Sequence, residues 1–252
     1  PSSVGVVPKT MPNIKPKVLV KEGDSVRCGD ILFEDKTESR YRFFSPGAGI
    51  IKRIVLGERR AVNSIEIDLD STESYREFES ISPSSISSIS SDKLRKTLED
   101  TGLWTYLKSF PFRTIAPLDE VPPSIYVALD DLEPFKPQTM EYIKGNKDAF
   151  HFGVQCLKQL SDNIVVSCSE SSKELHKELG GVITHSMKGN YPATEAGVVL
   201  YHNKTTEAEN KSWFITGQDL ITIGASLMAG RIIPERIVTL GGPYSKTRKH
   251  FK

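Results

Sequence analysis

Three acidic side chains stand close together directly after one apolar run of the sequence. The run SIYVAL, residues 124–129, predicts a buried strand, and Asp130, Asp131 and Glu133 follow it in the stretch ALDDLEP. Ligands bind at the carboxyl ends of strands in open α/β sheets, so these carboxylates are candidates for holding a ribose or a cation. No other chemistry-bearing group converges on them, and Pro134 closes the run. We therefore favour a solvated turn between strand and loop over a binding site.

A lysine, Lys36, occupies a position that suggests covalent carrier chemistry. It follows the run ILFED in the stretch VKEGDSVRCGDILFEDKTESRYRFFSPGAGIIKRI, where short apolar runs alternate with Gly, Asp and Pro. Domains that carry lipoyl or biotinyl arms have a similar pattern, with the modified lysine at a hairpin tip. Such a lysine must project from a tight hairpin, whereas the stretch from Lys36 to the Pro-Gly-Ala-Gly turn is longer than in a carrier. We predict that Lys36 is an ordinary exposed lysine.

The remaining motifs for phosphate or metal chemistry are incomplete. Gly47-Ala48-Gly49 is the one G-x-G, but it lacks the third glycine and the following helix of a pyrophosphate site, so we predict a hairpin turn there. The histidines never form H-x-H or H-E-x-x-H, and C-x-x-C is absent. His185, within GVITHS, is expected to be a core or strand-end residue. We therefore predict no metal site in this chain.

The cysteines and the charge balance limit the class of protein further. Cys28, Cys156 and Cys168 are an odd number, lie far apart and sit mostly among apolar residues, as is typical of a reducing compartment. The 252 residues include 33 basic and 32 acidic side chains, a formal net charge of +1, which gives no reason to expect nucleic acid. No apolar run approaches the roughly 20 residues of a membrane-spanning helix, and the first residues do not form a signal-peptide pattern.

The first part of the chain has the texture of an all-β domain. Short apolar runs separated by Gly, Pro, Asp and Arg predict strands at 17–20, 31–34, 41–44, 50–56 and 64–69. From residue 71 to residue 91 the composition shifts to Ser and Glu, including SISPSSISSISS, which indicates a polar linker. We therefore divide the chain into a β domain at 1–72, a serine-rich linker at 73–91 and a second domain at 92–252.

Beyond the linker, strands and helices alternate. Ser91 is a candidate cap for a helix over DKLRKTLED, with Leu94 and Leu98 on one face and Gly102 as the stop signal. The runs SIYVAL, NIVVSC, GVITHS and RIVTLGG predict strands, and helices are predicted at 148–160, 171–179 and 218–229. This alternation favours a parallel, Rossmann-like α/β domain. The fold class is thus all-β followed by α/β, with a biotinyl/lipoyl-like barrel-sandwich module first.

Four long stretches resemble a known family in order and spacing. They are KVLVKEGDSVRCGDILFEDK, FFSPGAGIIKRIVLGERRAVNSIEI, TGLWTYLKSFPFRTIAPLDEVPPSIYV and TGQDLITIGASLMAGRIIPERIVTLGGP. The family is NqrA, a component of the bacterial sodium-translocating NADH:quinone oxidoreductase, and the likeness extends from about residue 4 to residue 243. Members of that family are longer at both ends, so the resemblance implies that this chain is an N-terminal two-domain portion, truncated before further C-terminal domains.

The resemblance implies a role within a complex. The enzyme passes electrons from NADH to ubiquinone and exports Na⁺, with its flavins and iron centres in partner subunits. We expect this chain to be a peripheral subunit on the bacterial cytoplasmic side of the inner membrane, without a cofactor, that docks other subunits and has a candidate role in quinone interaction. By this likeness Lys36 belongs to an unmodified scaffold, and the chain alone is not catalytic.

The second domain is also similar to the flavin-binding subunit of respiratory complex I and to the corresponding Rnf subunit. Those proteins place a glycine-rich loop against a flavin phosphate, because only backbone without side chains can approach it. Here the matching residues are Gly102, Leu103, Trp104 and Thr105, whose side chains would collide with the phosphate, and ALDDLEP lacks the relatives' cysteine. This pattern predicts a filled-in cofactor site. Trp104 and Phe112 are then core residues, or they line a residual apolar pocket for a quinone ring.

Two other functions stay open at this point. A lipoyl-like carrier module would bear a covalent adduct on Lys36. A flavin- or nucleotide-binding redox domain of the complex I or Rnf type would bind flavin mononucleotide or NADH at Gly102 to Thr105 and at the acidic residues Asp130 and Glu133.

Overall fold

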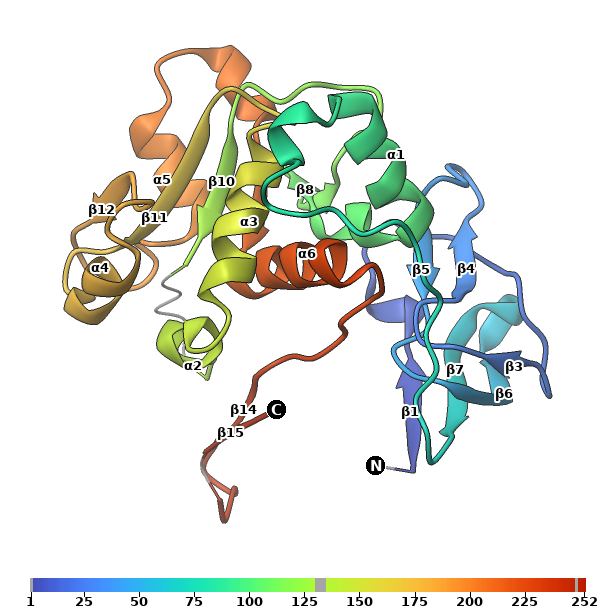
Figure 1. Ribbon diagram of the computed structural model, residues 1–252. Helices are drawn as coiled ribbons and strands as arrows, with labels where there is room; N and C mark the ends of the chain where they lie inside the picture. The colour runs from blue at the N-terminus through green and yellow to red at the C-terminus, as the bar shows by residue number, and fades with distance from the viewer. Residues whose placement is uncertain (1, 130–134, 248) are drawn as a thin grey trace.

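The structure is a computed structural model that describes residues 2–129, 135–247 and 249–252. Asp130, Asp131, Glu133 and Pro134, the acidic run singled out in the sequence, lie outside the described residues. Figure 1 shows a β domain formed by the N-terminal part of the chain beside a larger domain of mixed helices and strands. Within the described residues, none of the helices combines the length and the apolar character needed to cross a membrane.

The β domain consists of two small sheets that enclose a common core. One sheet has the strand order β1-β7-β6-β3 and the other has the order β2-β4-β5. The strands are β1 Ser3–Val6, β2 Pro16–Val18, β3 Ser25–Val26, β4 Ile31–Asp35, β5 Arg42–Phe44, β6 Gly49–Leu56 and β7 Val62–Leu69. Ile65 and Ile67 alternate inward along β7, and Phe33 stacks on Phe43 with the ring centroids 4.5 Å apart. The all-β prediction for this region is confirmed.

The turn at Gly47 to Gly49 differs from its prediction. β5 pairs with β4, whereas β6 pairs with β7 and β3, so this turn carries the chain from one sheet to the other and is not a hairpin. A Cβ atom on Gly49 would lie 2.1 Å from the carbonyl oxygen of Asp68, so glycine is required by the close approach of β7. The sequence pattern shows a tight turn, but which strands pair is decided by packing.

The serine-rich segment at 73–91 packs against both domains. Tyr75 forms a β-bridge with Cys28 of the β domain, and its ring lies 4.1 Å from the guanidinium of Arg231 of the α/β domain. Further on, the N–H groups of Phe78 and Ile81 donate to carbonyl groups at the end of helix α6, Gly217–Ala229, each at 2.8 Å. Polar composition therefore coexists with regular anchoring of the backbone.

The second domain has a six-stranded sheet with the order β12-β11-β10-β13-β8-β9. β10 to β13 are parallel, and β8 joins β13 in the antiparallel sense. The strands are β8 Lys108–Ser109, β9 Thr114–Ile115, β10 Ile125–Ala128, β11 Ile164–Ser169, β12 His185–Met187 and β13 Trp213–Thr216. The parallel α/β arrangement predicted from the sequence is confirmed for these strands.

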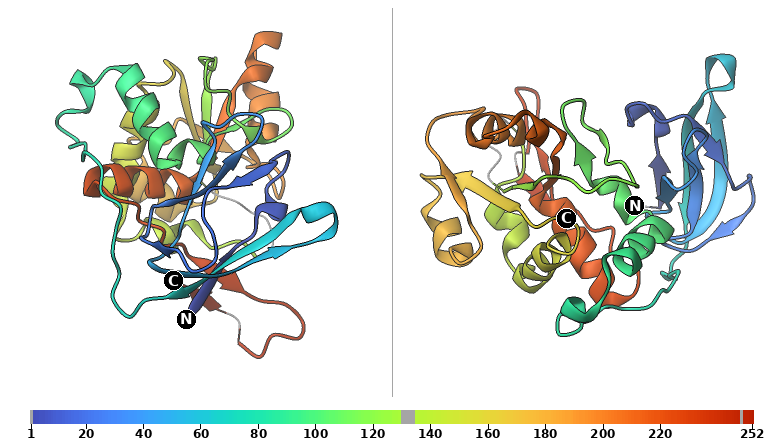
Figure 2. Two further views of the ribbon diagram at one scale, coloured as in Figure 1. Left: turned by 90° about the vertical axis from the view of Figure 1, so that its right-hand side faces the viewer. Right: turned by 90° about the horizontal axis from the view of Figure 1, so that it is seen from above.

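Helices cover both faces of this sheet (Figure 2). They are α1 Ser91–Thr101, α2 Thr139–Ile143, α3 Lys147–Leu157, α4 Lys173–Leu179, α5 Ala196–Asn203 and α6, with 3₁₀ turns η1 Pro8–Thr10, η2 Glu58–Arg60, η3 Ile86–Ser88, η4 Leu103–Tyr106 and η5 Glu207–Lys211. α3 and α6 contribute Leu157, Leu220 and Leu227 to the main core, and α5 packs on the opposite face against Tyr126 and Phe214.

Three local predictions need correction. The cap of α1 is Ser90, whose hydroxyl accepts the N–H of Lys93, and not Ser91. The run RIVTLGG contains β14 Val238–Leu240, which pairs with β15 Lys249–Phe251 outside the main sheet. The place beside β10 belongs to β13, from KSWFIT, which was not predicted as a strand.

Candidate functional site

Gly102, the first residue of the predicted vestigial flavin loop, serves the contact between the domains. It ends α1 with φ of 80°, as its role as a stop signal predicts. A Cβ atom at this position would lie 2.6 Å from the carbonyl oxygen of Arg42 and 3.2 Å from the ring of Phe44, both on β5. The absence of a side chain therefore lets the β domain approach the end of α1.

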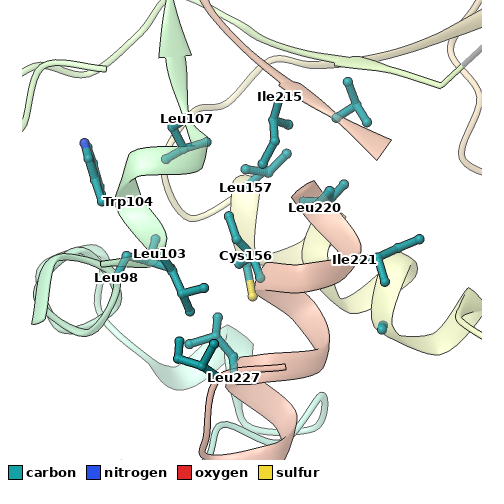
Figure 3. Close-up of a cluster of buried hydrophobic side chains, with 14 of the residues drawn as sticks. Leu98, Leu103, Trp104, Leu107, Cys156, Leu157, Ile215, Leu220, Ile221 and Leu227 are labelled. Atoms are coloured by element: carbon teal, nitrogen blue, oxygen red, sulfur yellow. The ribbon is translucent and has the colours of Figure 1, made fainter. Parts of the chain in front are cut away.

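Leu103 and Trp104 are fully buried behind this contact. Both belong to the cluster that also contains residues from α1, α3 and α6, drawn in Figure 3. The indole Nε1 of Trp104 donates to the carbonyl oxygen of Ala116 at 2.8 Å, and its ring meets that of Trp213 edge to face at 5.6 Å. The space that a phosphate-binding loop would leave open is occupied by side chains of the core.

Phe112 is not part of this core. Its side chain is 80% exposed, at the turn between β8 and β9, so the prediction that Phe112 packs in the interior or lines a pocket with Trp104 is wrong. The prediction assumed that a large aromatic residue near a helix stop packs on the next layer. The turn instead leaves this ring outside both apolar clusters.

Thr105 and Tyr106 border a cleft of about 460 Å³ between the two domains. The walls of this interdomain cleft are mostly apolar. They comprise Val6, Thr10, Met11, Pro12, Ile14, Phe43, Phe44 and Pro46 from the β domain, and Thr105, Tyr106, Lys108, Arg113 and Ile115 from the α/β domain. Of the four residues of the predicted loop, Thr105 is the one that lines this cleft.

Two cationic side chains line the interdomain cleft. The Nζ atom of Lys108 donates to the carbonyl oxygen of Thr105 at 2.5 Å, and burial lowers the pKa of its ammonium group, which the charge of Asp219 partly offsets. Arg113 is paired with Glu195 and lies over the ring of Phe214. Lys108 has three N–H donors, so it can present a hydrogen bond to a ligand in the cleft. No sequence pattern marks Lys108, because the cleft forms only when the two domains meet.

A second cavity lies at the carboxyl ends of β10 and β13. The chain reaches β11 and β12 on one side of β10 and returns to β13 on the other, so this is the switch point at which open α/β sheets bind ligands. This switch-point crevice has a volume of about 310 Å³, and its lining includes Leu129, Thr216, Gln218 and Ile237.

The polar groups of the switch-point crevice are engaged within the protein. The amide of Gln218 accepts the N–H of Ile237 at 2.8 Å and donates to its carbonyl oxygen at 3.1 Å. Asp219, in the first turn of α6, accepts the hydroxyl of Thr216 at 2.7 Å and the guanidinium of Arg236 at 2.6 Å. The first turn of α6 thus already carries a carboxylate of its own, which disfavours a phosphate there.

Lys36 is exposed, but the loop that contains it is held in place. Its own N–H donates to the carbonyl oxygen of Lys15 at 2.9 Å. The carboxylate of the preceding Asp35 is buried; burial alone would raise its pKa, but hydrogen bonds from Thr37 and the N–H of Lys15 lower it below the usual value.

The same loop docks on the α/β domain through Arg40 and Tyr41. The guanidinium of Arg40 forms two 2.8 Å hydrogen bonds with the carboxylate of Asp119 and also pairs with Glu38. The hydroxyl of Tyr41 donates to the carbonyl oxygen of Ala116 at 3.2 Å. The hairpin that would carry a swinging arm in a lipoyl domain is here part of an interdomain contact.

The cysteines give no sign of a redox or metal centre. All three are buried and none forms a disulfide. Burial raises the pKa of the Cys28 and Cys156 thiols to about 12, so both are protonated at neutral pH. Cys168 lies 3.5 Å from the Nε2 atom of His176, and no group of three or more His, Cys, Asp or Glu side chains gathers anywhere in the described part of the chain.

This fold defines the class of protein: a barrel-sandwich hybrid domain attached to a parallel α/β domain. Comparison with known families agrees with both halves. The model of the NqrA N-terminal barrel-sandwich hybrid domain matches residues 1–70, and that of the NqrA second alpha/beta domain matches residues 89–232. The chain belongs to the NqrA family, which confirms the resemblance inferred from the four sequence stretches.

Curated relatives are named as the NqrA component of a Na(+)-translocating NADH-quinone reductase. The protein of Neisseria meningitidis serogroup B is 31% identical over 242 residues, which is 96% of this chain and 54% of the relative. That of Alcanivorax borkumensis is 30% identical over 251 residues, 99% of this chain and 56% of the relative. The chain therefore spans about half the length of these relatives.

Proposed function

We propose that this chain is a docking subunit of a Na⁺-translocating NADH:quinone reductase, on the cytoplasmic side, and that it carries no cofactor of its own. The flavins and iron centres that move electrons from NADH to ubiquinone then belong to partner subunits. The names of the relatives support the complex. The observation that carries the absence of a flavin is the packing of Gly102 to Trp104 against β5 and the core.

The structure supports a scaffold role through the way its two domains are joined. The fork from Arg40 to Asp119, the hydrogen bond from Tyr41 and the anchored segment at 73–91 all hold one domain against the other. A docking subunit needs this property, because partners bound to different domains must keep a constant separation.

Native and denaturing mass spectra of the protein purified from its own type of cell test this proposal. A single species at the bare mass, 28.0 kDa for these 252 residues, is expected under both conditions. Added mass that survives denaturation would indicate a carrier arm on Lys36, and added mass lost on denaturation would indicate a bound flavin or nucleotide. Either result would overturn the cofactor-free assignment.

Activity provides the complementary test. The purified protein is expected not to oxidise NADH by itself, and to restore NADH-dependent quinone reduction when added to a complex that lacks its NqrA component. Oxidation of NADH by the isolated protein would contradict a docking role.

We further infer that the interdomain cleft accepts a quinone ring. Its volume of about 460 Å³ falls within the range typical of small-molecule sites, and its walls are mostly apolar. A quinone is a flat apolar ring with two carbonyl acceptors, and Lys108 offers a charged donor beside the aromatic residues Phe43 and Tyr106.

A photoreactive ubiquinone analogue tests the quinone inference. Labelled peptides are expected to contain residues 103–115 or 43–46, and excess unlabelled ubiquinone should prevent the labelling. Lys108→Met should reduce labelling by about tenfold, the effect of losing one charge-assisted hydrogen bond, whereas Lys36→Met should leave it unchanged. Labelling elsewhere, or labelling that unlabelled ubiquinone does not prevent, would exclude this cleft as the quinone site.

A further inference from the structure

The β6–β7 hairpin ends in a turn with an unusual backbone conformation. The N–H of Ala61 donates to the carbonyl oxygen of Glu58 at 3.1 Å, and Gly57 bonds Ala61 at 2.7 Å on the next rung. Between them Arg59 has φ of 53° and ψ of 29°, and Arg60 has φ of 60°. Two successive left-handed residues at the end of a two-residue hairpin loop form a type I′ turn.

The residue types at this turn conflict with its geometry. Type I′ turns strongly prefer Asn-Gly or Asp-Gly, because side chains on Cβ are disfavoured at positive φ. This chain has Arg-Arg there, so the backbone is strained where the hairpin projects from the domain, as both views of Figure 2 show. Strain of this kind is concentrated at functional sites. Arginine at these positions therefore has a use that outweighs its cost in stability.

The two arginines have no ionic partner in the described residues. Arg59 and Arg60 are exposed, and no ion pair or hydrogen bond joins either side chain to another part of the described chain. Other basic residues of the hairpin are paired, since Lys52 binds Asp68 and Arg53 binds Glu66, each at 3.0 Å. The unpaired cations are thus confined to the tip, beside Leu56, which is 53% exposed.

We propose that the Arg59–Arg60 turn docks on an acidic surface of another subunit of the same complex, and this inference rests on the proposed docking function. The chemistry recognised is that of carboxylates. Guanidinium groups match carboxylates with two parallel hydrogen bonds, and a turn with fixed dihedral angles directs both side chains before binding. A lipid surface attracts basic residues through charge and does not require a defined backbone, so the strained turn favours a protein partner.

The double variant Arg59→Asn with Arg60→Gly tests this assignment in the full-length protein. It supplies the residues that a type I′ turn prefers, so its melting temperature should equal or exceed that of the natural protein. Its Kd for the remaining purified subunits in detergent should rise by about tenfold for each charge-assisted hydrogen bond that the arginines no longer form. Lys52→Gln, on the same hairpin, should leave this Kd unchanged, and Arg59→Lys with Arg60→Lys should give an intermediate loss.

The outcomes separate this inference from the function on which it rests. If the double variant binds the other subunits as tightly as the natural protein does, the docking turn is refuted and the docking function remains. If the natural protein itself does not bind them, both proposals fall. Vesicles containing phosphatidylglycerol are the second probe: binding that the double variant loses while its Kd for the other subunits is unchanged would assign the turn to a membrane surface and overturn the protein partner.

Discussion

The interdomain cleft and the switch-point crevice differ in how their polar groups are used. The switch-point crevice lies where α/β sheets bind ligands, yet Gln218 bonds Ile237 across it and Asp219 holds both Thr216 and Arg236. The interdomain cleft has no such precedent in the fold, yet it keeps apolar walls and the donor Lys108. The position of a cavity in a fold therefore indicates function only when its hydrogen-bonding groups are not already satisfied internally.

The largest effect is expected from Gly102→Ala, at the edge of the interdomain cleft. The new Cβ atom meets the backbone of Arg42 at 2.6 Å and also occupies positive φ, so unfolding free energy should fall by about 2–4 kcal/mol. Urea denaturation measures this loss. Gly145→Ala is the matched control, since Gly145 has φ of 82° but no atom within 4 Å of the position that a Cβ would take, and should lose only about 1 kcal/mol. Equal losses would show that the domains do not meet at Gly102.

Gln218→Ala should have the next largest effect and would test the closed state of the switch-point crevice. The N–H and carbonyl of Ile237 lose their partner, which we expect to cost about 1–3 kcal/mol in local stability. Hydrogen exchange at the Ile237 amide should accelerate accordingly. Unchanged exchange would mean that the side chain of Gln218 does not hold this segment.

Asp35→Asn tests the rigidity of the loop beside the interdomain contact through its pH dependence. Because hydrogen bonds lower the folded-state pKa of Asp35 below its ordinary 3.8, its contribution to stability is present above that pH and is lost as the pH falls through the folded-state value. At pH 7 the variant should be less stable by about 1 kcal/mol, and the difference should shrink below pH 3.8. A pH-independent difference would contradict a role for the ionised carboxylate.

The smallest effect is expected from Asp119→Asn, which removes the charge from the Arg40 fork. Asp119 is 79% exposed, so solvent screens the pair and the change in global stability should be slight. The expected result is faster hydrogen exchange in residues 36–41, with no change in the switch-point crevice. Faster exchange in both regions would show that the two cavities are coupled.

The sequence predicted the parts of this fold that depend on local pattern. Alternating apolar residues predict β4, β6 and β7, and Gly102 marks the end of α1. The pairing of strands was less accessible. The runs that form β13 and β14 are both short and apolar, and only contacts with distant residues place β13 in the sheet and β14 in a separate hairpin.

The candidate site was only partly predictable for the same reason. Thr105 was singled out and lines the interdomain cleft, but Lys108 and the wall from the β domain were not, because Phe43 and Lys108 meet through tertiary contact. Phe112 misled because its residue type indicates burial, whereas its place in a turn determines its exposure.

The segment at 73–91 has a consequence for how the molecule comes apart. Its backbone is bonded to Cys28 at one end and to the end of α6 at the other, and the ring of Tyr75 lies under Arg231. The exposed serines between these anchors are accessible to a protease, but a cut there breaks the chain without breaking the anchors. The nicked halves should stay together in solution and melt in one cooperative transition, so the two domains form a single thermodynamic unit.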